Sequence, residues 1–245
     1  MKALLMAAGK GTRLKPLTDK QPKCMIDIHG SPLLRIWLEL LARHGVTEVL
    51  INTHHHAAIV DRFLNAYQTE TQLIINTVFE PQLLGSAGTL WHNRHWASGQ
   101  GPFIIAYADN LTNADLTQMV RSHNQVPEKE LVLTMGLIHA PIPSECGIVT
   151  LAPNHRIIDF EEKPQAPQSD LANGGIYIAN PNIFDYFPTD LAANKNQDGQ
   201  VFDIGHHVLP RLINKMQGVI IDGYLKDIGN PTAYQQALTE WPSIK

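Results

Sequence analysis

The sequence predicts an α/β fold in which helices flank a mixed, mostly parallel central sheet. One pattern leads to this fold class. In the first half of the chain, short apolar runs of strand length alternate with amphipathic stretches of helix length. Such a βαβ rhythm is typical of parallel strands that helices cover on both faces. The length of 245 residues allows one large domain or two small ones, and neither an internal repeat nor a Gly/Ser-rich linker marks a boundary.

Periodicity and glycine positions define the elements of the first half. Residues 33–43 carry leucines and Trp37 at helical spacing, and Gly45 follows as a stop signal. By the same criteria we expect strands at 2–7, 48–52, 73–79 and 103–108, helices at 33–43, 57–67 and 87–96, and a glycine-rich loop at 8–16. The glycine-rich loop therefore directly follows the first buried strand.

The second half is less regular, because proline-rich turns separate its apolar runs. Here we expect strands at 131–139, 147–151, 156–161, 175–179 and 218–222, helices at 202–214 and 232–241, and mobile surface loops at 163–169 and 189–200. Pro210 is expected to interrupt the helix at 202–214. A single domain with an irregular second half is the simplest organisation that these patterns predict.

Composition and charge exclude several classes of protein. Nineteen Lys and Arg against 23 Asp and Glu give a net charge of −4, without the basic stripe typical of nucleic-acid-binding proteins. The apolar run at 4–8 is too short for a membrane span, and Gly9 ends it too early for a signal sequence. Cys24 and Cys146 fit neither a disulfide framework nor a metal-binding spacing. We therefore expect a cytoplasmic globular protein with no nucleic-acid or membrane partner.

The loop at 7–14 carries the strongest local signal for chemistry. It contains Gly9 and Gly11, and such glycines allow successive backbone N–H groups to approach an anion. A dinucleotide fingerprint would need glycine in place of Leu14, and a Walker A phosphate loop would need Ser or Thr after Lys10, so neither pattern is met. Arg13, whose planar guanidinium suits a phosphate, adds a cation to this loop, and Lys23 adds a second one ten residues further on.

Further short motifs follow this loop along the chain. Residues 9–18, together with Pro22-Lys23, resemble the start of the sugar-1-phosphate nucleotidyltransferases, also called nucleotide-sugar pyrophosphorylases. The other motifs that carry this resemblance are Leu84-Gly85-Ser86-Ala87-Gly88, Asp109 at a strand end, Glu162-Lys163-Pro164, Asn173-Gly174-Gly175-Ile176-Tyr177 and Asp227-Ile228-Gly229-Asn230-Pro231. The resemblance covers nearly the whole chain and implies a Rossmann-like nucleotidyltransferase fold.

The resemblance also implies a role for each matched residue. The family transfers a nucleoside monophosphate from a nucleoside triphosphate to a sugar 1-phosphate and releases pyrophosphate. The implied catalytic residues are Arg13 on the departing pyrophosphate, Lys23 by the α-phosphate and Lys163 on the sugar phosphate. The implied nucleotide-binding residues are Ala8, Gly9, Gly11, Thr12, Arg13, Glu80, Gly85, Ser86 and Gly88. The implied sugar-phosphate-binding residues are Gly147, Glu162, Lys163 and Asn173, and the implied Mg²⁺ ligands are Asp109 and Asp227.

Elementary chemistry agrees with these roles. In-line displacement at phosphorus needs positioning and neutralisation of negative charge more than covalent help from the protein. The attacking group is an ionised phosphate, so no general base is required. Cationic side chains and a Mg²⁺ ion supply the positive charge, and Mg²⁺ commonly takes one or two carboxylates and leaves its other positions to phosphate and water.

Glu80 bears on the choice of base. It lies five residues before Gly85, where similar enzymes place a base-reading side chain, and its carboxylate could accept the adjacent N1–H and N2–H donors of guanine. A glutamine would suit uracil or thymine, although a glutamate also serves uridylyl transfer in such families. GTP is therefore the expected nucleotide, and the chain most resembles the short bacterial mannose-1-phosphate and manno-heptose-1-phosphate guanylyltransferases. The alternatives are uridylyl or thymidylyl transfer, transfer to a non-sugar phosphate such as phosphocholine, and a non-catalytic nucleotide-sugar sensor.

We expect one catalytic domain over residues 1–245, in which 1–115 mainly bind the nucleotide and 116–245 mainly bind the sugar phosphate. This expectation leaves no room for the repeat-built extension that some relatives carry. A homodimer is compatible with the sequence, since 202–214 could present an apolar stripe. His54-His55-His56 is not expected to bind a metal, because adjacent side chains cannot all face one ion.

Overall fold

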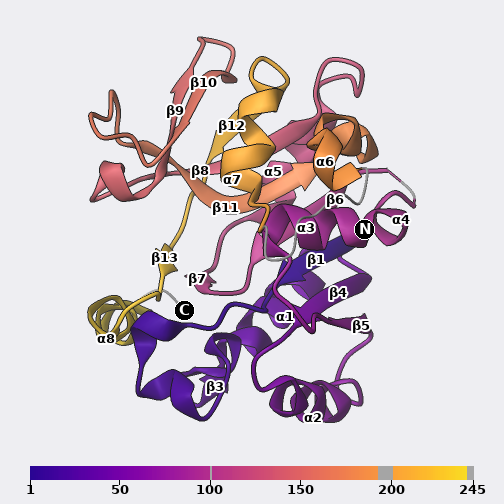
Figure 1. Ribbon diagram of the computed structural model, residues 1–245, viewed down its shortest axis with the longest axis vertical. Coiled ribbons are helices and arrows are strands. Elements are labelled where there is room, and N and C mark those ends of the chain that lie inside the picture. Colours follow the sequence, from indigo (N-terminus) through magenta and orange to yellow (C-terminus); the bar gives the residue numbers. More distant parts are fainter. Residues whose placement is uncertain (100, 193–200, 242–245) are drawn as a thin grey trace. The chain divides into compact units, whose positions relative to one another are not determined.

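The chain leaves one folding unit and re-enters it twice, so that each of two units is built from separate stretches of sequence. The computed structural model describes residues 1–99, 101–192 and 201–241. The first unit contains Met1–Leu83, Ala106–Asp115 and Asp222–Lys245, and the second contains Leu84–Ile105 and Leu116–Ile221 (Figure 1). Strand β6 (Phe103–Tyr107) runs from the second unit into the first.

Three parallel strands form the sheet of the first unit. They are β1 (Lys2–Met6), β4 (Glu48–Thr53) and β5 (Ile74–Phe79), in the order β5-β4-β1. Leu4 and Leu5 of β1 are fully buried, as expected for a parallel strand covered on both faces. The connecting helices are α1 (Leu33–Arg43) and α2 (Ala57–Tyr67), and α2 packs beside β5 (Figure 1). Both helices have the bounds that the sequence predicts, and α1 is followed by Gly45 with a φ of +79°, a left-handed conformation typical of helix ends.

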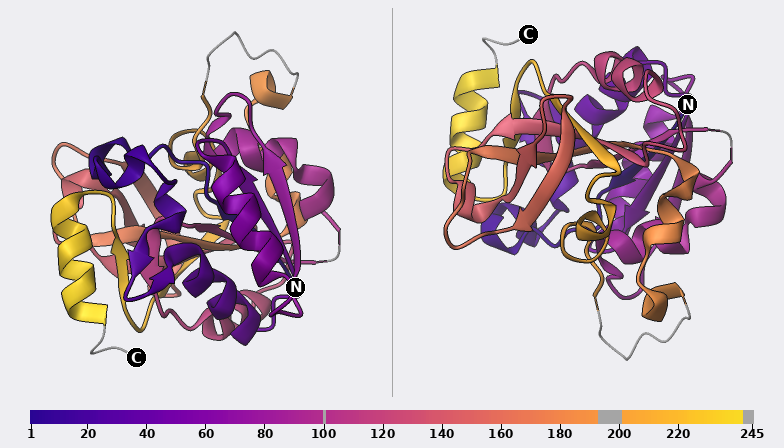
Figure 2. Two further views of the ribbon diagram at one scale, coloured as in Figure 1. Left: turned by 90° about the horizontal axis from the view of Figure 1, so that it is seen from below. Right: turned by 90° about the horizontal axis from the view of Figure 1, so that it is seen from above.

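Short elements complete the first unit. They are the 3₁₀ helices η1 (Thr12–Leu14), η2 (Leu17–Asp19) and η3 (Lys23–Met25), the antiparallel pairs β2 (Asp27–Ile28) with β3 (Ser31–Pro32) and β7 (Asn110–Thr112) with β13 (Leu225–Asp227), and helix α8 (Pro231–Glu240). Helix α8 lies alongside β13 (Figure 2). Tyr224 Oη and Lys226 Nζ both donate hydrogen bonds to Glu240 Oε2, at 2.8 and 2.7 Å. Helix α8 therefore fixes the strand that carries Asp227.

The sheet of the second unit is mixed. Its strands are β8 (Leu133–His139), β9 (Gly147–Leu151), β10 (Arg156–Glu162), β11 (Leu171–Ala179) and β12 (Met216–Ile220), in the order β11-β8-β12-β10-β9. Strands β8 and β12 pair in parallel, whereas β11–β8, β12–β10, β10–β9 and β11–β9 pair antiparallel. The predicted mixed sheet with flanking helices is confirmed, and most of its antiparallel pairs belong to the second unit.

The helices of the second unit differ in part from the sequence-based expectations. They are α3 (Gly85–His92), α4 (Arg94–Ala97), α5 (Leu116–Asn124), α6 (Thr189–Ala192) and α7 (Ile204–His207), with the 3₁₀ helices η4 (Pro143–Glu145), η5 (Pro181–Tyr186) and η6 (Leu209–Leu212). The helix expected at 87–96 divides at Asn93, because the Asn93 side chain donates to Thr89 O at 2.8 Å and ends α3. The helix expected at 202–214 is limited to α7 and η6, and Pro210 lies in η6.

Two further expectations need correction or restriction. The sequence-based expectations do not include helix α5. Its buried residues include only two apolar ones, Leu116 and Met119, which are too few to define a helical period. Of the loop expected at 189–200, the first four residues form α6, and 193–200 lie outside the described residues. None of the described helices combines the length and the apolar character that crossing a membrane requires.

A polar group lies inside the core of the second unit. His123 of α5 is 2% exposed, and its Nδ1 forms a hydrogen bond of 2.8 Å with Thr134 Oγ1, which also accepts from Gln217 Nε2 at 3.0 Å. No partner is found for His123 Nε2 among the described residues. Burial lowers the pKa of His123, against a smaller opposing effect of the Asn180 side chain. The folded protein therefore favours the neutral imidazole.

Acidification is expected to destabilise the protein through this residue. Below its ordinary pKa of about 6.5 the unfolded chain binds a proton that the folded ring resists, so the free energy of unfolding should fall by up to about 1.4 kcal/mol per pH unit. Urea unfolding at about pH 7.5 and about pH 5.5 measures this loss, and His123→Gln should lose less than the wild type. An equal loss in both proteins would show that His123 is not its source.

Candidate active site

The glycine-rich loop begins where β1 ends and folds back on the residues that follow it. Gly11 has a φ of +60°, and a Cβ atom there would lie 2.9 Å from Thr18 Cγ2. Thr18 Oγ1 donates to Gly11 O at 2.8 Å. Gly9, Thr12 and Arg13 are exposed, whereas Ala8 is buried. Gly11 is thus required for the fold of the loop, and the loop presents Gly9, Thr12 and Arg13 to solvent.

A buried lysine joins two carboxylates from distant parts of the first unit. Lys23 lies in η3 and is 6% exposed. Its Nζ donates to Asp109 Oδ2 and to Asp227 Oδ1, both at 2.9 Å. Arg13 Nη2 lies 4.0 Å from Asp227 Oδ2. The fold therefore brings together four residues that the sequence predicts as catalytic or metal-binding residues.

Strand pairing places the two carboxylates. Asp227 is opposite Asn110 in the β13–β7 pair, and the Ile228 N–H donates to Asp109 O at 3.2 Å. A Cβ atom on Gly229 would lie 2.7 Å from Asp227 Oδ2 and 3.0 Å from Arg13 Nη2. Gly229 therefore leaves the space that the Asp227 carboxylate and the Arg13 guanidinium occupy.

The donor set suits a hard cation. Asp109 and Asp227 both direct an oxygen at one positive group, the Lys23 ammonium, and their side chains are 43% and 55% exposed. Mg²⁺ is commonly held by one or two carboxylates with phosphate and water as its other ligands. Among the described residues, no set of three or more His, Cys, Asp or Glu is gathered as metal ligands. The two aspartates therefore offer two carboxylates that could share one divalent cation.

Cys24, next to Lys23, takes no part in this chemistry. It is 2% exposed, and burial raises the pKa of its thiol to about 12. A thiol with such a pKa is not ionised near neutral pH and is a poor nucleophile.

Glu80 is buried at the end of β5 and linked to the glycine-rich loop. It is 3% exposed, and its Oε1 accepts from Asn52 Nδ2 at 2.9 Å. Asn52 Oδ1 in turn accepts the N–H of Ala7 at 2.7 Å. Asn52, which belongs to none of the sequence motifs, thus connects the predicted base-reading residue with the start of the predicted phosphate-binding loop.

The three adjacent histidines follow β4 and have separate contacts. His54 Nδ1 forms a hydrogen bond of 2.8 Å with Glu80 O, and His56 Nε2 one of 3.1 Å with Asp19 O. The rings of His55 and His56 lie 3.9 Å apart. Two of the three histidines thus form hydrogen bonds with main-chain oxygens of other segments.

In the second unit, the start of α3 is closely covered by main chain. Gly85 has a φ of +77°, and a Cβ atom there would lie 2.3 Å from Phe202 O. The same oxygen accepts the N–H groups of Ala87 and Gly88, at 3.0 and 3.4 Å. A Cβ atom on Gly88 would lie 2.9 Å from Leu84 Cβ. Both glycines are therefore needed for packing in this structure, in addition to the nucleotide contacts that the sequence predicts for them.

Ser86 lies between these glycines and is bonded to the segment before α7. Its Oγ donates to Asp203 Oδ2 at 2.7 Å and accepts the N–H of Ile204 at 2.8 Å. Asp203 also caps α7 by accepting the N–H of Gly205 at 2.7 Å. Ser86 belongs to a sequence motif, whereas Asp203 lies 117 positions away and belongs to none.

Glu162 ends β10 with its carboxylate between two glycines. A Cβ atom on Gly147 would lie 2.7 Å from Glu162 Oε2, and one on Gly205 would lie 2.6 Å from it. Burial and then the Asp203 carboxylate raise the pKa of Glu162, while His206 and Lys163 oppose the shift. The structure thus brings Gly147 and Glu162 together, as the sequence predicts, and adds Asp203 and Gly205.

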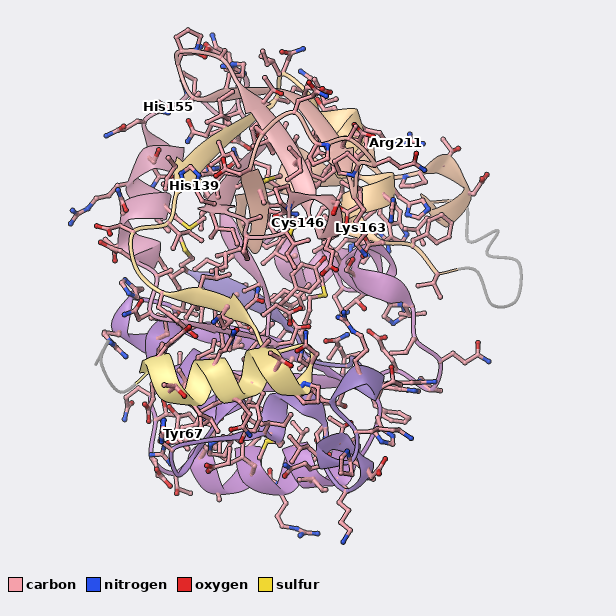
Figure 3. The ribbon with its side chains drawn as sticks, turned by 90° about the vertical axis from the view of Figure 1, so that its left-hand side faces the viewer. Tyr67, His139, Cys146, His155, Lys163 and Arg211 are labelled. Carbon is pink, nitrogen blue, oxygen red and sulfur yellow. The ribbon has the colours of Figure 1, made fainter. Side chains whose placement is uncertain are left out.

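Lys163 and Asn173 lie on neighbouring parts of the second unit. Lys163 is exposed, has a φ of 51° and donates its N–H to Cys146 O at 3.0 Å. Figure 3 shows Lys163 next to Cys146. Asn173 donates from Nδ2 to Tyr177 Oη at 2.7 Å and accepts the N–H of Gly175 at 3.0 Å. Cys146 is half-buried and packs against the buried cluster that contains Ile148 and Ala172.

The fold and these residues define an α/β protein whose cations, carboxylates and exposed glycine loop suit ligands that carry phosphate groups. A family model described as nucleotidyl transferase matches residues 2–243. The chain belongs to this family, and the family predicted from the motifs is confirmed.

Individual relatives differ in the nucleotide that their names give. The UTP–glucose-1-phosphate uridylyltransferase of Synechocystis sp. is 31% identical over 97% of this chain and 62% of its own length. The mannose-1-phosphate guanyltransferase of Schizosaccharomyces pombe is 31% identical over 96% of this chain and 62% of its own length. The chain thus spans about 62% of the length of both relatives.

A solved structure agrees with the fold. The UDP-glucose pyrophosphorylase crystallised with UDP-glucose is 21% identical and matches with a TM-score of 0.80 over 100% of this chain and 99% of that chain. The predicted nucleotidyltransferase fold is therefore confirmed.

Proposed function

We propose that the protein transfers a nucleoside monophosphate, GMP from GTP, to a sugar 1-phosphate of the mannose or heptose type and releases pyrophosphate. The observation that carries this proposal is the buried Lys23 ammonium held between Asp109 and Asp227, with Arg13 4.0 Å from the second aspartate. An enzyme that binds a triphosphate must neutralise its negative charge and stabilise the charge that develops on the departing pyrophosphate. Charged groups held in fixed positions meet this requirement.

The chain's own residues neutralise and orient the nucleotide. Gly9 and Thr12 offer an exposed stretch of backbone for the phosphates, and Arg13 stabilises the departing pyrophosphate through its planar donors. Lys23 faces the α-phosphate, where negative charge grows as the attacking oxygen approaches. No proton has to be removed, because the attacking sugar phosphate is already ionised.

Asp109 and Asp227 would hold Mg²⁺, since one oxygen of each carboxylate already accepts a hydrogen bond from the same cation, the Lys23 ammonium. When bound, the ion would neutralise the phosphates and orient them. The carboxylates carry opposite charge to Lys23 and so keep its ammonium in place before substrates bind.

The second unit supplies the residues proposed for the sugar phosphate. Lys163 is an exposed cation and steers the phosphate group. Glu162 and Asn173 offer a carboxylate and an amide for sugar hydroxyls, while Gly147 leaves space for the Glu162 carboxylate. Cation, carboxylate and amide together suit a phosphorylated polyol better than a phosphorylated quaternary amine, which would favour aromatic groups.

Glu80 supports guanine as the base. Its carboxylate is held by the Asn52 amide, so its orientation is fixed before a nucleotide binds. A carboxylate accepts two adjacent N–H donors, which guanine offers and uracil does not. If uracil bound instead, its carbonyl oxygens would face the buried Glu80 carboxylate. The carboxylate would then lack hydrogen-bond donors, which would weaken the binding of the nucleotide.

A matrix of substrates tests the proposal. GTP, UTP, dTTP and CTP are each combined with mannose, heptose and glucose 1-phosphate and with phosphocholine, and released pyrophosphate is measured. GTP with mannose or heptose 1-phosphate should react fastest, and Glu80→Gln should lower the preference for GTP over UTP by about tenfold, the effect of one lost hydrogen bond to a charged group. Faster reaction with UTP or dTTP would replace the proposed base. A folded protein that is inert with every pair would contradict the proposed activity.

A further inference from the structure

Asp203 makes hydrogen bonds in two directions inside the second unit. Its Oδ1 accepts the N–H groups of Gly205 and His206, at 2.7 and 3.3 Å, at the start of α7. Its Oδ2 accepts the hydroxyl of Ser86 at 2.7 Å, and Ser86 Oγ accepts the N–H of Ile204 at 2.8 Å. One carboxylate therefore ties the first turn of α3 to the first turn of α7.

Main-chain bonds fix the same two segments. The Phe202 N–H donates to Leu84 O at 3.2 Å, and Phe202 O accepts the N–H of Ala87 at 3.0 Å. The residue before Asp203 is thus bonded on both sides to the start of α3. A displacement of α3 near Ser86 would therefore carry Asp203 and α7 with it.

Helix α7 in turn bounds the space of the Glu162 carboxylate. Gly205, the residue whose N–H Asp203 accepts, leaves room for Glu162 Oε2, since a Cβ atom there would lie 2.6 Å from that oxygen. Gly147 also leaves space for this oxygen, since a Cβ atom on Gly147 would lie 2.7 Å from Glu162 Oε2. The segment fixed by Asp203 therefore forms one side of the space that the Glu162 carboxylate occupies.

We propose that Asp203 is a positioning residue that couples the nucleotide-binding turn at Ser86 to the sugar-reading carboxylate of Glu162. This inference rests on the proposed function, which assigns Ser86 to one substrate and Glu162 to the other. Occupation of the turn around Ser86 by a nucleotide then sets the position of Gly205, and through it the position of the carboxylate that reads the sugar.

The charge of Asp203 contributes as well as its hydrogen bonds. The charged or titratable groups that face Glu162 are Asp203 and His206 from the α7 segment and Lys163 from its own chain neighbour. Of these, Asp203 raises the pKa of Glu162, and the other two lower it. Removing the Asp203 charge should therefore move the acidic limb of the pH profile for sugar 1-phosphate to lower pH.

Two substitutions separate geometry from charge. Asp203→Asn removes the charge but keeps an oxygen that can accept from Gly205 and His206, and its amide nitrogen can donate to Ser86 Oγ, so that the bond to Ser86 is kept with its direction reversed. Asp203→Ala removes the charge and all of these bonds. With GTP and mannose 1-phosphate, Asp203→Ala should raise the KM of the sugar about tenfold and that of GTP about threefold. Asp203→Asn should leave both KM values unchanged when they are measured near neutral pH, and should shift only the acidic limb of the pH profile.

Asn154→Ala is the matched control. Asn154 also accepts a backbone N–H, that of Arg156, but at the opposite end of β10. This variant should leave both KM values and the pH profile unchanged.

A second measurement does not depend on turnover. In protein labelled at the glutamate side-chain carboxyls, the NMR titration of Glu162, assigned with Glu162→Gln, should move to lower pH in Asp203→Asn. If Asp203→Ala does not fold, Gly205→Ala replaces it and should raise the KM of the sugar with little effect on that of GTP. Unchanged titration of Glu162 together with KM values like those of the wild type would overturn the coupling. An inert wild-type protein in which the Glu162 titration still shifts would instead overturn the proposed function and leave the link from Asp203 to Glu162 intact.

Discussion

Replacing Lys23 by methionine is expected to lower kcat/KM at least a hundredfold, within the range of about 10²–10³ known for a positioned donor in a catalytic site. Two losses combine. The α-phosphate loses its cation, and Asp109 and Asp227, which now share one ammonium at 2.9 Å, face each other without it. Lys23→Arg should not restore activity, because the larger planar guanidinium cannot replace a buried ammonium that contacts both carboxylates.

The measurement is the initial rate of pyrophosphate release over a range of GTP concentrations at saturating sugar 1-phosphate, which gives kcat/KM, with circular dichroism to confirm folding. Lys15→Met is the matched control in the same unit, because Lys15 is exposed and its ion pair among the described residues is with the exposed Asp19, at 3.3 Å. An exposed pair contributes about 0.2–1 kcal/mol, so the control should remain active. A Lys23→Met protein with more than a fifth of the wild-type activity would contradict the assigned role.

The regular first half of the fold could be predicted from sequence because its signals are local. The apolar spacing of residues 33–43 and 57–67 gives the bounds of α1 and α2 directly. In the second unit, the course of the strands depends on pairing between distant segments, such as β12 with β8. Strand β11 begins at Leu171, four residues before the predicted start, because Leu171–Asn173 pair with 137–139 of β8. No local pattern contains that information.

The candidate site divides in the same way. Charged residues within motifs, such as Lys23 and Asp227, could be selected from sequence, and the fold brings them into contact. The residues that hold them in place could not be selected. Asn52 acts on Ala7 across 45 positions and Asp203 on Ser86 across 117 positions, and each is an ordinary polar residue in its own segment. Their roles follow from three-dimensional contacts alone.

Gly85→Ala is expected to cause the largest loss of stability among single substitutions at the glycines of the candidate site. The added Cβ would lie 2.3 Å from Phe202 O and 2.6 Å from Val201 Cγ1, and the residue has a φ of +77°. The left-handed backbone costs about 1–2 kcal/mol with a side chain, and overpacking costs about 1–3 kcal/mol. The free energy of unfolding should therefore fall by about 2–5 kcal/mol.

Gly30→Ala separates these two contributions. Gly30 has a φ of +86°, and a Cβ atom there would meet nothing within 4 Å, so its substitution measures the backbone cost alone. Urea unfolding of both variants should show that Gly85→Ala loses at least about 1 kcal/mol more than Gly30→Ala. Because the Phe202 carbonyl also accepts the N–H groups of Ala87 and Gly88, the displacement should loosen the turn at Ser86 and raise the KM of the nucleotide. If both variants lost the same free energy of unfolding, the segment at Phe202 could move to accommodate the added Cβ atom. The close packing of Gly85 would then not explain why glycine occupies this position.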